Sequence, residues 1–168
     1  MGPRAELLLG ACLAGVAVTL LGHAAASALV LDRELGAGQL ARATQWSPSG
    51  ALAAAAAALA LLAWHGRAAA GGARAWRPAG MAARGTALAL LLYPAAAALW
   101  LPACAALDRW QGADPAMPWA EVLKWLPSVV LGATLAALIA GTVPAYASAF
   151  LICRRYLRRQ ACSTTDPA

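Results

Sequence analysis

One uncharged run near the C-terminus constrains the fold of this chain more than any other feature. Residues 126–153 contain no Asp, Glu, Lys or Arg, and the basic segment that follows runs from Arg154 to Arg159. A helix of about 20 apolar residues spans a bilayer core, so this run is long enough to cross a membrane. As one continuous helix it would be about 42 Å long, and we expect it to tilt, to protrude or to bend near Pro144.

Three further apolar runs predict an all-α membrane protein. Apolar residues make up 62% of the 168 residues and charged residues only 12%, whereas soluble domains are about a quarter charged. We expect residues 1–159 to form a single four-helix transmembrane bundle and residues 160–168 to form a disordered tail. The predicted spans cover residues 7–31, 47–65, 85–107 and 126–153.

The first loop is expected to lead into a helix N-terminus. Residues 32–49 mix acidic and basic side chains and close with Trp46, Ser47 and Pro48. Serine is favoured at the N-cap and proline at the first helical position. We therefore expect Ser47 to cap the second helix and Pro48 to begin it.

The first span has a rival interpretation as a signal peptide. Arg4 would form its basic region, residues 7–22 its apolar region, and residues 26–28 (Ala-Ser-Ala) a cleavage site. The apolar run continues past that site to Leu31, which favours a retained helix. Cleavage there would leave the orientation of the other three spans unchanged.

The distribution of arginine determines the predicted orientation. Residues 66–84 contain four Arg and no acid, and residues 154–159 contain four more, whereas residues 32–49 and 108–124 are mixed in charge. Cytoplasmic segments of membrane proteins carry the excess of Lys and Arg. Both basic segments lie on one side only if the short alanine-rich run at 47–65 also spans. We therefore predict an N-in/C-in arrangement, and the composition, rich in Ala and Arg, favours a bacterial inner membrane.

The few polar residues of the spans argue against several classes of membrane protein. His23 falls in the outer half of the first span and His65 at the inner edge of the second, so the two imidazoles cannot ligate one haem iron. No pair of cysteines falls in an outer loop, as four-span thiol-oxidising enzymes require. No Asp, Glu, Lys or Arg falls within a span, which counts against a proton-coupled antiporter. We predict no catalytic residue, no metal site, no cofactor and no nucleic-acid partner.

His23 is the leading candidate for a functional polar site within a span. It follows Thr19 by four residues on a stripe of small and polar side chains. As a structural residue it would be neutral and hydrogen-bonded, to Thr134 or near Trp100 at a similar depth. As a functional residue it would be a ligand or proton site in the outer half. The structural role is the favoured interpretation.

Tyr93 and Tyr146 form a second candidate for a polar site. Both fall about 10–12 Å from the predicted inner face, so they would meet across the third and fourth spans. Two buried tyrosines that find hydrogen-bond partners are the favoured interpretation. A small polar pocket between them is the alternative.

Small residues on the last span predict a helix-contact face. They recur at every fourth position along two adjacent ridges, and small residues let membrane helices approach closely. We expect this face to serve the bundle itself, with a partner helix or a second copy of the chain as the alternative. Its central members are Gly132, Ala136, Ala140 and Gly141.

Together these features predict a small polytopic integral membrane protein. A non-enzymatic accessory, assembly or structural role in the lipid bilayer is the favoured hypothesis. A subunit of a transporter or channel is the first alternative. A membrane enzyme with an outer-face site around His23 and the acidic residues of the loops is the second.

Overall fold

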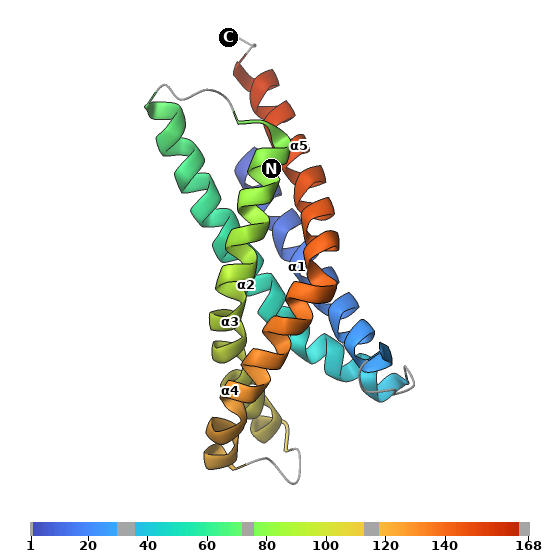
Figure 1. Cartoon of the computed structure of the whole chain (residues 1–168). Helices are drawn as coiled ribbons and strands as arrows, with labels where there is room; N and C mark the ends of the chain where they lie inside the picture. The colour runs from blue at the N-terminus through green and yellow to red at the C-terminus, as the bar shows by residue number, and fades with distance from the viewer. Residues whose placement is uncertain (1, 30–35, 72–75, 113–117, 165–168) are drawn as a thin grey trace.

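The structure is a computed structural model, and it describes residues 2–29, 36–71, 76–112 and 118–164. These residues form an all-α bundle in which four helices are long and apolar enough to span a membrane. The last of the four is built from three consecutive elements, α4, η1 and α5 (Figure 1). The elements are α1 (Pro3–Leu29), α2 (Ala37–Ala70), α3 (Pro78–Trp110), α4 (Trp119–Ala136), η1 (Ala137–Gly141) and α5 (Thr142–Thr164).

The outer surface of the bundle is apolar along its length. Leu91, Leu99 and Ile139 each expose more than 70% of their surface. A soluble protein rarely leaves such large apolar side chains in water over a whole surface. The exposed leucines and isoleucines are therefore positioned to contact lipid, as expected for a multi-pass membrane protein.

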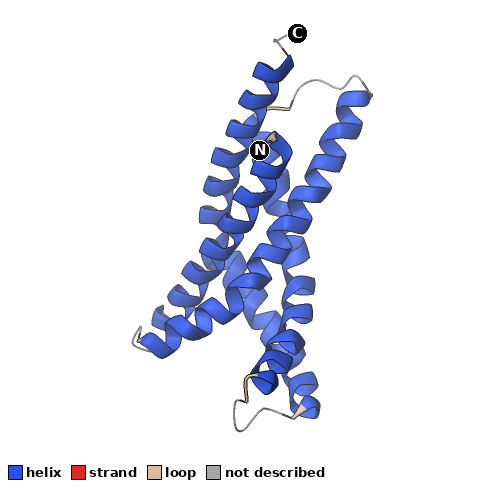
Figure 2. Cartoon of the chain, turned by 180° about the vertical axis from the view of Figure 1, so that it is seen from behind, coloured by secondary structure: helices blue, strands red, loops and turns tan. Residues whose placement is uncertain are grey.

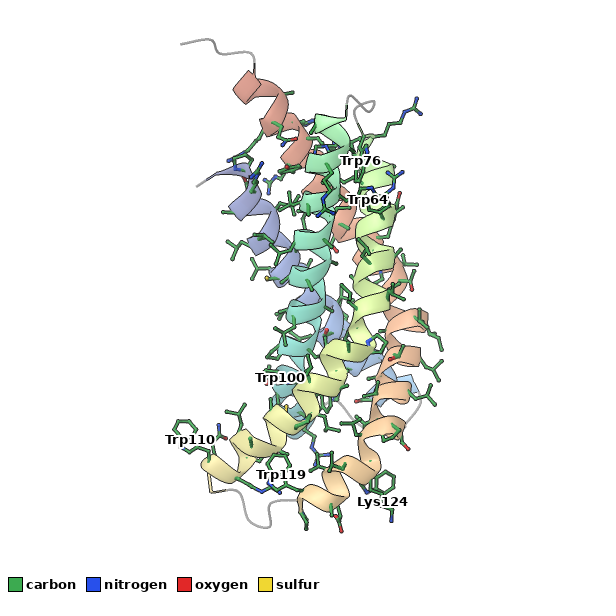
Figure 3. All side chains as sticks on the ribbon, turned by 90° about the vertical axis from the view of Figure 1, so that its left-hand side faces the viewer. Trp64, Trp76, Trp100, Trp110, Trp119 and Lys124 are labelled. Carbon is green, nitrogen blue, oxygen red and sulfur yellow. The ribbon has the colours of Figure 1, made fainter. Side chains whose placement is uncertain are left out.

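The helices form a ring with one weak contact. α1 packs against α2, α5 and η1, and α3 packs against α2, α4 and α5, whereas α1 and α4 barely touch. Figures 1 and 2 show why: the α1–α2 pair and the α3–α4 pair diverge at the end of the bundle away from the two termini. We call that the distal end, marked by Trp110 and Trp119, and the opposite one the basic end, marked by Trp64 and Trp76 (Figure 3). Arg84 lies against Trp76 at the basic end.

The second helix begins earlier than predicted. α2 starts at Ala37, so residues 37–49 are helical, and the expectation that Ser47 caps a helix beginning at Pro48 is wrong. Pro48 has no N–H to donate to the carbonyl of Thr44. The Ser47 hydroxyl donates to that carbonyl instead, at 2.8 Å. This local hydrogen bond lets the helix continue through the proline.

The last helix also extends further than predicted. α5 continues to Thr164, so residues 160–164 are helical and the expectation of a disordered tail there is wrong. Residues 165–168 lie outside the described part of the chain. Before α5, the π-helical turn η1 ends at Gly141, three residues before Pro144. Because Pro144 cannot donate to the carbonyl of Ala140, a wider turn at this point is the expected accommodation.

α1 and α2 cross at two glycines. A Cβ atom added to Gly15 would overlap the carbonyl oxygen of Gly50 and lie 2.9 Å from the Cβ of Ala54. A Cβ added to Gly50 would overlap the Thr19 hydroxyl and the Gly15 carbonyl oxygen. The two backbones therefore meet directly, as small residues allow between membrane helices.

The basic end is closed by a packed core. Leu7, Leu61, Met81, Cys153 and Tyr156, which come from four different helices, form one buried cluster, and each is less than 5% exposed. Packing of this kind excludes water and other molecules from the end of the bundle.

Aromatic and charged side chains lie over that core. The Trp64 and Trp76 rings are perpendicular at 5.5 Å, and the Arg84 guanidinium lies 4.5 Å from the Trp76 ring centre. Arg159 and Glu6 form an ion pair at 2.8 Å, which joins the last helix to the first.

At the distal end, polar contacts join α2 to α3. The Trp100 indole Nε1 donates to the Gln45 carbonyl at 2.8 Å. The Gln45 side chain donates from Nε2 to Asp108 Oδ1, also at 2.8 Å. These contacts hold α2 and α3 together where α1 and α4 separate.

Candidate functional site

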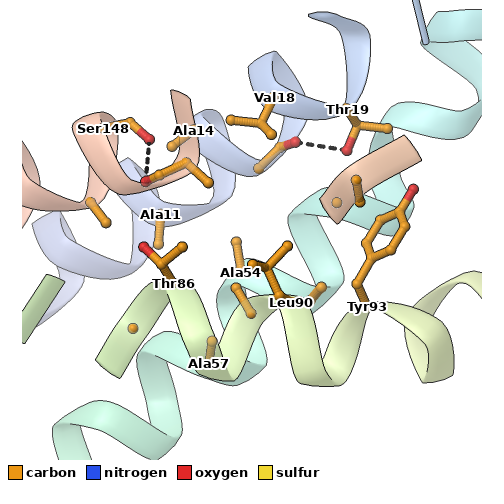
Figure 4. A pocket seen from close by; sticks show the side chains of 18 of the residues that line it. Ala11, Ala14, Val18, Thr19, Ala54, Ala57, Thr86, Leu90, Tyr93 and Ser148 are labelled. Carbon is orange, nitrogen blue, oxygen red and sulfur yellow. Dashed lines mark hydrogen bonds between the residues drawn. The ribbon is translucent and has the colours of Figure 1, made fainter. Parts of the chain in front are cut away.

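An elongated cavity of about 380 Å³ lies at the centre of the bundle. This volume is within the range of about 300–1,000 Å³ that small-molecule sites occupy. The side chains that line it come from every helical element, and Figure 4 shows those of α1, α2 and α3 around it. The cavity therefore depends on the whole bundle and not on one helix pair.

The walls of the cavity are mostly apolar. Alanines and glycines leave the space open, with Ala54 and Ala57 from α2 and Ala89 from α3 as examples. Among the described residues that line it, none is Asp, Glu, Lys or Arg. A charged group placed inside would lose its hydration without a counter-charge, at a cost of several kcal/mol. The lining therefore suits a neutral, largely apolar occupant.

The cavity is closed at the basic end of the bundle. Leu7, Leu61 and Cys153 line it and also belong to the buried cluster that seals that end. In the distal half it is lined by His23 from α1 and Val129 from α4, the two helices that barely contact each other. The cavity therefore reaches from the sealed basic end to the part of the bundle where α1 and α4 separate.

Most polar side chains along the cavity satisfy their hydrogen bonds locally. Thr19 donates to the Gly15 carbonyl at 2.9 Å, and Ser148 donates to the Pro144 carbonyl at 2.9 Å (Figure 4). Such bonds to the preceding helical turn are the usual solution for Ser and Thr in apolar helices.

Two polar atoms in the cavity wall lack a partner. Within the described part of the chain, Thr86 Oγ1 and His23 Nε2 are the buried side-chain nitrogen and oxygen atoms that form no hydrogen bond. Thr86 is only 7% exposed. Leaving such a buried group unsatisfied costs about 1–3 kcal/mol. Both atoms therefore mark places where an occupant of the cavity would gain a hydrogen bond.

The expected partners of His23 bond elsewhere. The Thr134 hydroxyl donates to the Val130 carbonyl, and the Trp100 indole donates to Gln45. Nε2 of His23 forms no hydrogen bond within the described residues. Whether His23 is a structural or a functional residue stays a prediction.

The other predicted site residues separate into two groups. Thr19 and Tyr93 line the cavity together with His23. Tyr146 does not line it and is 39% exposed. The structure therefore brings three of the four residues to one cavity. Across the described residues, no three His, Cys, Asp or Glu side chains gather into a group that could hold a metal ion.

The predicted helix-contact face is used only in part within the bundle. Gly141 is buried against α1, where an added Cβ would lie 3.3 Å from the Val18 side chain. Gly132 is exposed and has open space beside it among the described residues. Ala136 and Ala140 are half-buried. The role of this face toward a partner stays a prediction.

Thr86 is a site residue that sequence reasoning missed. It lies near the start of an apolar run, and its hydroxyl is one turn away from the carbonyl of Ala82, to which threonine in a helix normally donates. The sequence contains one weak signal, a lone hydroxyl among Gly, Ala and Leu over residues 85–92. Only the packed structure shows that this hydroxyl points into the cavity without a partner (Figure 4).

Comparison with protein-family models, with curated proteins and with solved structures finds no match to this chain. The function is therefore argued from the cavity and the bundle that surrounds it.

Proposed function

We propose that this integral membrane protein is a non-enzymatic accessory protein that holds a largely apolar molecule in its central cavity. The observation that carries the proposal is the 380 Å³ cavity itself, apolar and free of charged side chains among its described lining residues. Large apolar pockets with few polar groups are the usual form of sites for small apolar ligands. The separation of α1 from α4 in the distal half would give such a molecule a route from the bilayer.

The uncharged walls favour binding over ion transport. Ion and proton pathways through membranes are marked by ionisable side chains that face the pathway. The only residue of that kind along the cavity, in the described part of the chain, is His23. A transporter or channel subunit is therefore the less favoured role.

The arginine-rich end supports the proposed orientation. Arg84, Arg155 and Arg159 all belong to the end where the chain begins and where α5 ends, and positive residues favour the cytoplasmic side. We propose a multi-pass protein of a bacterial inner membrane with both ends of the chain in the cytoplasm. A reporter enzyme fused after Arg159 that is active only outside the cell would contradict this orientation.

The cavity proposal can be tested with one matched pair of variants. Ala89 lines the cavity, whereas Ala87 lies two residues away on the exposed side of α3. We expect Ala89→Leu to fill the cavity and to abolish ligand retention, and Ala87→Leu to leave it unchanged. Native mass spectrometry of the full chain released from mild detergent would show the bound mass in each case. Equal retention by the two variants would disprove the proposal.

The same measurement tests the proposed partners. The lipid bilayer is the expected environment, and the exposed part of the small-residue face, around Gly132, is proposed to contact a partner helix or a second copy of the chain. A dimer or hetero-complex mass that disappears in Gly132→Leu would support this contact. A monomer under all mild conditions would count against it.

A further inference from the structure

The cavity has the length of an extended hydrocarbon chain. Contacts to α2 mark its two ends. At one end Leu61 packs beside Gly85, the residue before Thr86. At the other end Gly50 meets Thr19, which lies one helical turn before His23. Leu61 lies 11 residues after Gly50 and 15 residues after Trp46, the first residue of α2 in the cavity wall. This stretch of helix is about 20 Å long. The cavity therefore runs along the helices over a length that suits an extended hydrocarbon chain.

The lining of the cavity suits a hydrocarbon chain. Its walls are mostly alanine and glycine, so an extended methylene chain fits between them. A charged headgroup does not suit the cavity, because no Asp, Glu, Lys or Arg is among its described lining residues.

The closed end of the cavity contains a hydroxyl without a hydrogen-bond partner. Thr86 is more than nine-tenths buried, and its Oγ1 has no partner in the described part of the chain. Figure 4 shows it pointing from α3 into the space bordered by Ala11 and Ser148. The Ser148 hydroxyl is already bonded to its own helix. A methyl-ended chain would leave Thr86 unsatisfied, whereas a chain that ends in a neutral oxygen would satisfy it.

We propose that the cavity binds a single-chain, neutral lipid with its polar end innermost, hydrogen-bonded to the hydroxyl of Thr86. This inference rests on the proposed function, because it names the class of ligand for the same cavity. Long-chain alcohols, aldehydes and other neutral oxygen-ended chains belong to the class. Carboxylates do not, because no described cationic side chain lines the cavity to pair with them. Thr86 is thus the residue that distinguishes a polar-ended chain from an ordinary acyl tail.

The two ends of the cavity make different contributions to binding. His23 and Trp46 line the other end of the cavity, away from Thr86, and the buried His23 Nε2 could bond to a second polar group of the chain there. The selectivity for an oxygen at the end of the chain therefore belongs to Thr86. We expect His23 to affect the overall affinity but not the preference for an alcohol over an alkane.

The test compares hexadecanol with hexadecane, both tritiated, by equilibrium binding to the full chain in phosphatidylcholine nanodiscs, with uptake by empty nanodiscs subtracted. We expect the wild-type protein to prefer hexadecanol by about fivefold, the ratio produced by a net hydrogen-bond contribution of about 1 kcal/mol. Thr86→Val should remove that preference without weakening the binding of hexadecane. Thr86→Ser, which keeps the hydroxyl, should restore the preference.

Thr134→Val is the matched control, because Thr134 is also a helical threonine of a span but bonds to its own helix and lies outside the cavity wall. It should bind both chains as the wild type does. A preference for hexadecanol that survives in Thr86→Val would overturn the inference, as would a preference that disappears in His23→Leu but not in Thr86→Val.

The outcomes separate this inference from the proposed function. If Ala89→Leu blocks binding and Ala87→Leu does not, the cavity holds a chain whatever the result for Thr86. If wild type then binds the alcohol and the alkane equally, only the inference about the polar end fails. If Ala89→Leu binds both chains as well as Ala87→Leu does, the proposed function fails and the inference fails with it.

Discussion

Gly15 of α1 and Gly50 of α2 meet backbone to backbone, with no space for a side chain on either residue. The contact lies beside the cavity, since both glycines also line it. It brings α1 close to α2 at this level, while the alanines around it leave the adjacent space open. The same use of very small residues therefore creates both the tightest helix contact and the cavity.

Substitution of Gly50 by alanine is expected to destabilise the bundle. The added Cβ would overlap the Thr19 hydroxyl and the Gly15 carbonyl, and overpacking of this kind typically costs about 1–3 kcal/mol. Gly66→Ala in the same helix is the control, because Gly66 is exposed with open space around it among the described residues. It should be neutral or stabilising by up to about 1 kcal/mol. Thermal unfolding in detergent, followed by circular dichroism, measures both, and equal stabilities would refute the close contact.

Loss of the Trp100 hydrogen bond is expected to weaken the distal end. Trp100→Phe keeps an aromatic ring but removes the donor to the Gln45 carbonyl, which should lower the free energy of unfolding by about 0.5–1.5 kcal/mol. Trp110→Phe is the matched control on α3, because Trp110 is 85% exposed. Titration with a denaturing detergent would compare the two variants. A larger loss in Trp110→Phe than in Trp100→Phe would contradict the assignment.

Removal of the Thr86 hydroxyl is expected to stabilise the empty protein. Thr86→Val replaces an unsatisfied buried hydroxyl with a methyl group of similar shape, which should recover part of the penalty of about 1–3 kcal/mol. Thr134→Val removes a satisfied hydroxyl and should not stabilise. The measurement is the unfolding temperature of protein stripped of bound lipid. If Thr86→Val unfolds at a lower temperature than wild type, the hydroxyl has a partner, such as a buried water, and the argument from its unsatisfied state fails.

Trp76 is expected to be the most important aromatic residue of the basic end. Its ring contacts the rings of Trp64 and His65 and lies under the Arg84 guanidinium. Trp76→Ala should therefore reduce the free energy of unfolding by about 2–4 kcal/mol, less than the loss of a fully buried tryptophan. Trp125→Ala, at a position that is 53% exposed, should change it much less. Comparable losses would show that the cluster contributes little, and chemical unfolding followed by tryptophan fluorescence would reveal it.

Local sequence patterns did not fully predict where the helices begin and end. Serine followed by proline normally marks a helix start, yet Ser47 and Pro48 lie inside α2 because the Ser47 hydroxyl replaces the missing hydrogen bond to Thr44. Shortly before Pro144 the helix widens into the π-helical turn η1. Both prolines have the same local chemistry, and the neighbouring residues decide whether a helix ends, widens or continues.

The sequence predicted only some of the residues of the candidate site. His23, Thr19 and Tyr93 stood out as polar residues within apolar runs, and the structure places all three along one cavity. Tyr146 stood out for the same reason and lies elsewhere. Thr86 did not stand out, since a hydroxyl in a helix is expected to bond to its own backbone. A hydrogen bond that is not formed leaves no pattern in a sequence.

The sequence by itself determined that this chain forms four membrane-spanning helices, because the length of an uncharged run and the thickness of a bilayer are compared directly. It also determined the separation of the arginine-rich segments from the mixed ones. Only the tertiary structure decided that α1 and α4 barely touch, that an apolar cavity lies at the centre of the bundle, and that Thr86 Oγ1 and His23 Nε2 in its wall are unpaired. The physical reason is that spanning depends on the composition of each helix alone, whereas a cavity depends on how the small residues of all the helices fail to fill the space between them.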